Sequence, residues 1–171
     1  QGLKYRQQII YTSNTLSIVN DSKSTSFSSS INLINSFNNV FWILGGQPKK
    51  KDIFNFQKNK KTNISAYIFG KNKKFFIKKL NKKVKFQVFP SIKNALNKIL
   101  IDIKKLNINS KKVILFSPSS ASFDEYKNFE ERGAYFDSLV KSFKNKLWYS
   151  LKFIKVFILI GGGALIKLFF F

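Results

Sequence analysis

The sequence predicts an α/β fold: a Rossmann-like, mostly parallel sheet of about six strands with helices on both faces. Short, continuous apolar runs alternate with segments of helical apolar spacing through most of the 171 residues. Such runs are typical of strands covered on both faces, and their alternation with helices is typical of parallel sheets. With 44% hydrophobic residues, the chain has enough apolar side chains to build one core.

Each strand and helix is predicted from its local pattern. Residues 7–12 and 16–20 are β-prone runs around Ser13-Asn14, which predicts an opening hairpin. The predicted later strands are, in chain order, 40–44, 64–69, 84–89 and 113–116. The predicted helices are a Ser-rich segment that ends near residue 37, a short one at 52–57, then 75–80, 91–106 and 123–143.

The segment 113–133 combines a buried strand, a small polar loop and a helix that we expect to begin after Ser122. Ser122 and Glu125 have the spacing of a capping box, in which each side chain bonds a backbone N–H at the helix start. Strand, small-residue loop and helix N-terminus together form an arrangement that binds anions in open α/β sheets. The same spacing is found in ordinary well-capped helices, so the pattern alone leaves both interpretations open.

The formal charge of the chain is +23, from 31 Lys+Arg against 8 Asp+Glu. Such a charge favours binding to nucleic acid or anionic lipid. However, only Arg6 and Arg132 are arginines, whereas phosphate-clamping surfaces usually favour Arg. The lysines are scattered, and the joint abundance of Lys, Asn, Ile and Phe indicates A/T-rich codon usage, so the charge weighs little. The chain has no His and no Cys, which excludes a Ser-His hydrolase site and thiolate metal sites.

Residues 144–171 differ in composition from residues 1–143, which we expect to form one domain. They contain a run of Phe, Ile and Leu and no acidic residue. The stretch 153–171 is about long enough to span a bilayer, although Lys155 and Lys167 lie within it. The tail is predicted to be a hydrophobic helix. Three interpretations of it stay open: a membrane anchor, a read-through or out-of-frame tail, or an appendage that packs on the domain.

Four polar motifs follow one another along the chain. They are Gly2-Leu3-x-x-Arg6, Asn20-Asp21-Ser22-Lys23-x-Thr25, Leu44-Gly45-Gly46-x-x-Lys49 and the segment from Ser117 to Gly133. In this order they resemble the C-terminal domain of the Mur ligases, and most closely the branch that adds D-glutamate to a peptidoglycan precursor. Ser120 stands where the family has cysteine, and the family pattern ends near residues 140–143, so the tail departs from it.

The resemblance implies an ATP site formed by Arg6, Asp21 and Lys23. Arg6 and Lys23 would lie near the phosphates, where cations neutralise charge on a transferring phosphoryl group, and Lys23 would be the catalytic residue. Asp21 would accept hydrogen bonds from the ribose hydroxyls. Without the family, the same residues suit an exposed strand position and a turn.

The resemblance also implies a D-glutamate site formed by Thr25, Lys49, Ser122 and Phe129. Lys49 would hold one carboxylate as a point charge, and Ser122 the other, with the pairing of individual carboxylates left open. Thr25 would donate its hydroxyl, and Phe129 its backbone N–H. The sequence alone does not distinguish Lys49 from the two lysines that follow it, and Thr25 is equally suited to cap the next helix.

In such ligases, ATP activates the carboxylate of UDP-N-acetylmuramoyl-L-alanine as an acyl phosphate, and the amine of D-glutamate displaces the phosphate. The chain has no Walker-type loop, so we expect it to be inactive alone. ATP and Mg²⁺ would serve the complete enzyme, with no metal ligands in this part. By the resemblance the protein would be a cytoplasmic monomer in peptidoglycan synthesis, although the tail at 153–171 leaves membrane association open.

Two alternatives without catalysis stay open. A basic nucleic-acid-binding module predicts binding to DNA or RNA that falls steeply with salt. A membrane-associated module predicts that the chain partitions with lipid and becomes soluble when the residues after Phe143 are removed.

Overall fold

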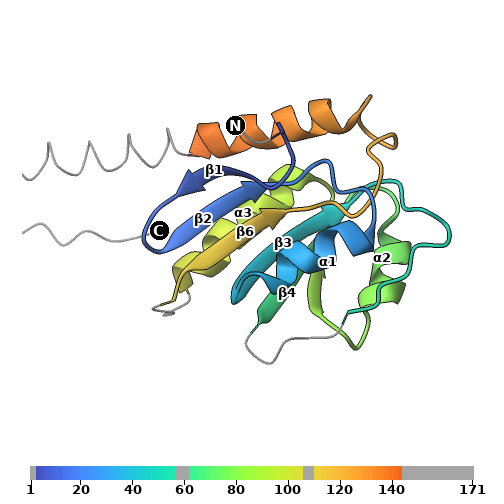
Figure 1. Ribbon diagram of the computed structural model, residues 1–171, viewed down its shortest axis with the longest axis horizontal. Coiled ribbons are helices and arrows are strands. Elements are labelled where there is room, and N and C mark those ends of the chain that lie inside the picture. Colours follow the sequence, from blue (N-terminus) through green and yellow to red (C-terminus); the bar gives the residue numbers. More distant parts are fainter. Residues whose placement is uncertain (1–2, 57–61, 106–109, 144–171) are drawn as a thin grey trace, which may run out of the picture. The chain divides into compact units, whose positions relative to one another are not determined.

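The computed structural model describes residues 3–56, 62–105 and 110–143 and contains one six-stranded sheet (Figure 1). Its strands are β1 (Gln8–Thr12), β2 (Leu16–Asn20), β3 (Asn39–Gly45), β4 (Asn63–Phe69), β5 (Lys85–Val88) and β6 (Lys112–Phe116). Their order across the sheet is β1-β2-β6-β3-β4-β5. The β1–β2 pair is antiparallel and every other pair is parallel, which confirms the predicted hairpin and mostly parallel sheet.

Helices connect most of the strands. They are α1 (Phe27–Asn35) after β2, α2 (Lys73–Leu80) between β4 and β5, α3 (Ile92–Lys105) between β5 and β6, and a helix over residues 129–143 after β6. The chain up to Asp137 forms one compact unit. Ser138 and the residues after it form a second unit, of which only the end of the last helix, 138–143, is described.

Helices cover both faces of the sheet, as predicted. Alternate residues of a strand point to opposite faces, so β3 divides its side chains between two cores. Val40, Trp42 and Leu44 pack with buried residues of α1 and α2. The intervening Phe41 and Ile43 are also buried, on the face where α3 contacts β3 and β4. On that second face the ring of Phe136, in the last helix, stacks on Phe116 of β6 at 4.3 Å between centroids.

The position of β6 determines where a ligand site is expected. β6 enters the sheet between β2 and β3, and the chain leaves β2 toward α1 on one face but leaves β6 toward the last helix on the other. Neighbouring parallel strands whose connections diverge to opposite faces leave a crevice at their carboxyl ends, where open α/β sheets bind ligands. The carboxyl ends of β2, β6 and β3 are followed by three of the four motifs.

Two predicted helix positions are wrong. Of the short helix expected at 52–57, residues 52–56 are described and are not helical, because Phe54 is buried against Phe27, with 5.0 Å between ring centroids. The last helix begins at residue 129, not at 123. The Ser122 carbonyl accepts the N–H groups of Glu125 and Tyr126 in a turn that precedes the helix.

The actual cap of the last helix lies six residues after Ser122. Asn128 Oδ1 accepts the Glu131 N–H at 2.8 Å, and Glu131 Oε2 accepts the Lys127 N–H at 2.7 Å. These reciprocal bonds satisfy N–H groups at the helix start, which is what a capping box does. Ser122 is thereby left outside the helix.

The predicted hydrophobic helix at 144–171 lies outside the described residues. Within the ranges that are described, none of the helices has the length and apolarity that crossing a bilayer requires.

Candidate functional site

The first two motifs are held together at the carboxyl end of β2. The Lys23 N–H donates to the Tyr5 carbonyl at 3.0 Å, and the Gln7 N–H donates to Asp21 Oδ1 at 3.1 Å. These bonds fix the turn that carries Arg6 beside the turn that follows β2. Arg6 itself is exposed.

The third and fourth motifs are joined at the carboxyl ends of β3 and β6. Gln47 and Ala121 exchange two backbone hydrogen bonds of 2.9 and 3.0 Å. The Ser120 hydroxyl donates to the Gly45 carbonyl at 2.7 Å. Gly46 has a φ of +128°, and a Cβ added there would lie 2.5 Å from the Ala121 carbonyl oxygen. The glycine therefore permits a backbone approach that no other residue allows.

Arg132 bonds to two of these loops at once. Its Nε donates to Ser22 Oγ at 3.1 Å, and its Nη2 donates to the Ser22 carbonyl at 2.8 Å and to the Ser120 carbonyl at 2.9 Å. Its Nη1 donates to the Ala121 carbonyl at 3.1 Å. The side chain is fully buried, and burial lowers its pKa to about 10, so it remains protonated at neutral pH.

A chain of buried serine hydroxyls lies beneath the loops. Ser30 of α1 is within 2.7 Å of the hydroxyl of Ser117 and 2.6 Å of those of Ser119 and Ser24. Ser117 donates in turn to Asp21 Oδ2 at 2.8 Å. A hydroxyl has one proton, so with Asp21 ionised Ser117 accepts from Ser30, and Ser30 accepts from the other two. Ser30, one of the serines that lower the helix propensity of α1, thus bonds to the loop after β6.

Asp21 is central to both networks and 4% exposed. Burial raises the pKa of its carboxyl above the ordinary value, although the bonds from Ser117 and Gln7 and the charge of Arg6 oppose the rise. Each oxygen accepts one hydrogen bond from the protein. A carboxylate has about four acceptor positions in total, so about two remain for a ligand.

Two hydroxyls at this rim differ from the others. Within the described part of the chain, the serines between residues 22 and 30 and those at 117, 119 and 120 all have hydrogen-bond partners. Thr25 and Ser122 have none for their side chains among these same residues. Thr25 is half-buried and Ser122 is 2% exposed. The alternative that Thr25 caps α1 does not hold, because Ser26 is the cap residue and accepts from the Ser29 N–H. Both hydroxyls are therefore available to a ligand.

The predicted cations lie on the same rim. Lys23 is exposed, and its Nζ lies 5.4 Å from the centroid of the Phe129 ring, so a residue predicted for ATP contacts one predicted for D-glutamate. Lys49 is exposed, and its carbonyl accepts the Asp52 N–H at 3.0 Å. Asp52 Oδ2 accepts the N–H of Phe27 at 2.8 Å, which anchors the turn that carries Lys49 to the start of α1.

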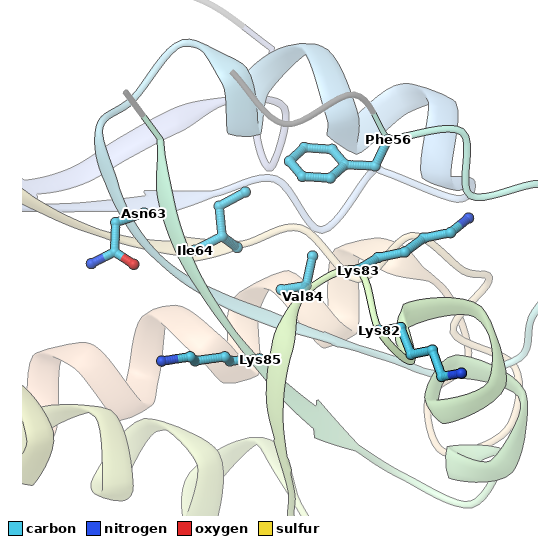
Figure 2. Close-up of a pocket in the computed structure, with 7 residues that line it drawn as sticks. All are labelled: Phe56, Asn63, Ile64, Lys82, Lys83, Val84 and Lys85. Carbon is cyan, nitrogen blue, oxygen red and sulfur yellow. The ribbon is translucent and has the colours of Figure 1, made fainter. Parts of the chain in front are cut away.

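A cavity of about 430 Å³ lies at the other end of the sheet, near the amino ends of β4 and β5. Phe56, Ile64 and Val84 point toward its centre, whereas Lys85 points away from Lys82 and Lys83 (Figure 2). The lysines do not converge, and no predicted site residue lines this cavity. Among the residues that the structure describes, no three acidic, His or Cys side chains are close enough to hold a metal ion.

Sequence reasoning missed two residues of this site. In the sequence, Arg132 stands out as one of two arginines, and the signal that could identify it is its place three residues after Phe129 in the fourth motif. Asp52 lies three residues after Lys49, but its bond to the backbone of α1 has no counterpart in the sequence pattern.

Comparison with known proteins identifies relatives of the chain. No family model matches the chain. A protein of Bartonella henselae is 34% identical over 148 residues, which are 84% of this chain and 31% of that protein. A protein of Rickettsia felis is 35% identical over 145 residues, 82% of this chain and 31% of that protein. One of Agrobacterium fabrum is 33% identical over 132 residues, 77% of this chain and 28% of that protein.

All three relatives are named UDP-N-acetylmuramoylalanine–D-glutamate ligase. The chain spans about three tenths of their length. Together with the four motifs at one rim of the sheet, these matches show that the chain belongs to the Mur ligase family.

Proposed function

We propose that this chain is the amino-acid-binding domain of an ATP-dependent ligase that joins D-glutamate to UDP-N-acetylmuramoyl-L-alanine. The observation that carries the proposal is the pair of hydroxyls at Thr25 and Ser122. They have no protein partners in the described part of the chain, whereas the serines around them are bonded. They belong to separate motifs that the hydrogen bonds of Arg132 bring together.

The chemistry of the substrate fits this rim. D-Glutamate has two carboxylates to be held and one amine that must stay free to attack. In this proposal Lys49 supplies a positive charge, and Thr25, Ser122 and the Phe129 N–H donate to the carboxylates. Holding both carboxylates fixes the direction of the amine, so the entropy of orientation is lost on binding rather than in the reaction step.

The ATP-facing residues of the proposal occupy the adjacent part of the rim. Arg6 and Lys23 are exposed cations, and Asp21 retains about two acceptor positions for ribose hydroxyls. We propose that they approach the nucleotide when this domain closes on the rest of the ligase, with Lys23 as the catalytic cation. Mg²⁺ would then be held by other parts of the enzyme.

The proposal is tested by titrating D-glutamate into the chain and into its Lys49→Ala variant, with L-glutamate as the comparison ligand. Removing a charge-assisted hydrogen bond costs about 1.5–3 kcal/mol, so we expect affinity to fall roughly tenfold to a hundredfold. Calorimetry or amide chemical shifts measure the change.

The two adjacent lysines are matched controls for this experiment. Lys50→Ala and Lys51→Ala remove the same charge from neighbouring exposed positions. Both should bind D-glutamate as the unmodified chain does. Equal losses in all three variants would indicate a general charge effect and contradict a specific role for Lys49.

Activity requires the parts that the chain does not span. Fusing it to the N-terminal domains of a related ligase should give ADP release that depends on D-glutamate. A well-folded fusion without this activity would contradict the proposal. Salt-sensitive binding of an oligonucleotide by the same chain would instead favour the nucleic-acid alternative.

A further inference from the structure

Arg132 is the least expected residue of this rim, because it is a fully buried charge that forms no ion pair among the described residues. All its acceptors are neutral: the hydroxyl and carbonyl of Ser22 and the carbonyls of Ser120 and Ala121. Burying a charge whose hydrogen-bond acceptors are neutral costs free energy. The nearby Asp124 carboxylate attracts the guanidinium, but burial outweighs this attraction and still lowers the pKa of Arg132. Stability alone therefore does not account for an arginine here.

The geometry of the guanidinium group explains better why an arginine occupies position 132. A guanidinium offers five donors in a rigid plane, whereas an ammonium offers three on a flexible stem. Here the plane bonds the loop after β2 and the loop after β6 simultaneously. A Cβ added at Gly46 would lie 3.0 Å from Nη1, so the loop after β3 packs against the same group.

The bonded atoms lie next to the residues assigned to D-glutamate. Ser22 is three residues before Thr25, and Ala121 is adjacent to Ser122. The Ser22 hydroxyl, which accepts from Arg132 Nε, donates to the Phe129 carbonyl at 2.8 Å. One side chain thereby sets the relative positions of all three.

We propose that Arg132 is the positioning residue of the D-glutamate site: its guanidinium fixes the loop of Thr25 against the loop of Ser122, so that their free hydroxyls face one ligand. This inference rests on the proposed function. Arg132 does not touch the substrate, and it acts through the backbone of both loops.

The test compares Arg132→Lys with a destabilised control in the full 171-residue chain. Leu80→Ala is the control, because Leu80 is fully buried in α2 and belongs to neither loop. Affinity for D-glutamate is expected to fall about tenfold to a hundredfold in Arg132→Lys, as for other displacements of site groups. Leu80→Ala should lower the melting temperature but leave affinity within about twofold, because distant sites act independently.

Amide chemical shifts without ligand provide a readout of loop position. The signals of Lys23, Gln47 and Ser122 should move in Arg132→Lys, while those in α3 stay in place. If Arg132→Lys folds, binds D-glutamate as the unmodified chain does and keeps these signals, the proposal is overturned.

A milder variant serves if Arg132→Lys does not fold. Ser22→Ala removes the acceptor of Nε and the donor to Phe129, and should move the same signals and weaken binding. Unchanged signals and affinity would overturn the proposal. If the unmodified chain itself fails to bind D-glutamate, the proposed function fails, and the ligand-free signals of the variants still decide whether Arg132 fixes the loops.

Discussion

The two ends of the parallel sheet differ in what they offer a ligand. The amino end contains the cavity of about 430 Å³, with apolar side chains at its centre and lysines that diverge. The carboxyl end contains the loops after β2, β3 and β6, which are bonded to one another. Among the described residues, the hydroxyls of Thr25 and Ser122 in these loops have no protein partner. The difference shows that a hollow is not by itself a site. Recognition requires polar groups that converge, and these lie at the end where strand connections diverge.

Among the residues that the structure describes, left-handed backbone conformations are distributed in the same unequal way. Tyr5, Gln7 and Ser119 have φ values of 59°, 49° and 57°, and all three lie in the loops of the carboxyl end. Lys82, with a φ of 62°, is the residue of this kind near the cavity. A left-handed conformation costs a non-glycine residue roughly 1–2 kcal/mol. Tyr5 and Gln7 flank Arg6, so hydrogen bonds to Asp21 and Gln8 hold this cation in a turn that the chain alone disfavours.

The largest effect is expected from Gly46→Ala at the carboxyl end. The new Cβ would lie 2.5 Å from both the Ala121 carbonyl oxygen and Ser120 Oγ, at a φ of +128°. Backbone must move to relieve this contact, so we expect the free energy of unfolding to fall by about 3 kcal/mol. Urea unfolding followed by circular dichroism measures the loss.

Gly70→Ala is the control that separates the contact from the strain. Gly70 has a φ of +85°, but its nearest neighbour to an added Cβ, Asp124 Oδ2, is at 3.4 Å. The unfolding free energy of Gly70→Ala should fall only by the roughly 1–2 kcal/mol that a left-handed φ costs a non-glycine residue. Equal losses at both positions would mean that the close approach of the loops after β3 and β6 contributes nothing.

An intermediate effect is expected from Ser30→Ala. This change removes the hydroxyl that joins Ser24, Ser117 and Ser119 and leaves buried oxygens short of a partner. An unsatisfied buried polar group costs about 1–3 kcal/mol, so we expect a loss of about 2 kcal/mol in unfolding free energy.

Two exposed positions sharpen the comparison. Ser36→Ala removes a hydroxyl that bonds the Asn32 carbonyl at the exposed end of α1, and Lys85→Ala changes the wall of the cavity. Each should alter stability by less than about 0.5 kcal/mol, as exposed substitutions usually do. A loss at Lys85 as large as that at Ser30 would contradict the difference between the two ends.

The strands were predictable because their signal is local. β3 and β4 are continuous apolar runs that end at glycines, and their predicted bounds differ from the observed ones by one residue. The start of the last helix was not predictable, because two capping patterns compete: Ser122 with Glu125, and Asn128 with Glu131. The two patterns have the same spacing, so the sequence alone does not choose between them.

The placing of the motifs at the carboxyl ends of the strands was predictable, and the hydrogen bonds between them were less so. The contact between Lys23 and Phe129 follows from motif order and strand topology. The role of Arg132 depends on the carbonyl and hydroxyl of Ser22, which lies 110 residues away in sequence and to which no local pattern points. Ser30 likewise reduces helix propensity locally, and its bonds to the loop after β6 are not visible in any local pattern.

A small effect of opposite sign is expected at Asp124, because one of its carboxyl oxygens is buried without a hydrogen-bond partner. Asp124 Oδ2 is buried without a hydrogen-bond partner, and burial raises the pKa of this carboxyl above its ordinary value. The folded state therefore holds this proton to a higher pH than the unfolded state does. Stability is lost as pH rises through the folded pKa, and the loss is absent at low pH, where the carboxyl is protonated in both states.

Asp124→Asn should therefore be more stable than the unmodified chain at pH 7, by about 0.5 kcal/mol, and equal to it near pH 3. Asp102→Asn is a control of opposite sign. Burial alone would raise the pKa of Asp102, but bonds from Lys98 and Tyr67 outweigh it and lower that pKa, so its loss should destabilise at pH 7. Thermal unfolding of the unmodified chain and of both variants, at pH 7 and near pH 3, measures the change in stability that each variant causes at each pH. A destabilised Asp124→Asn at pH 7 would show that Asp124 is bound by a partner of its own, and that the carboxyl end is satisfied throughout.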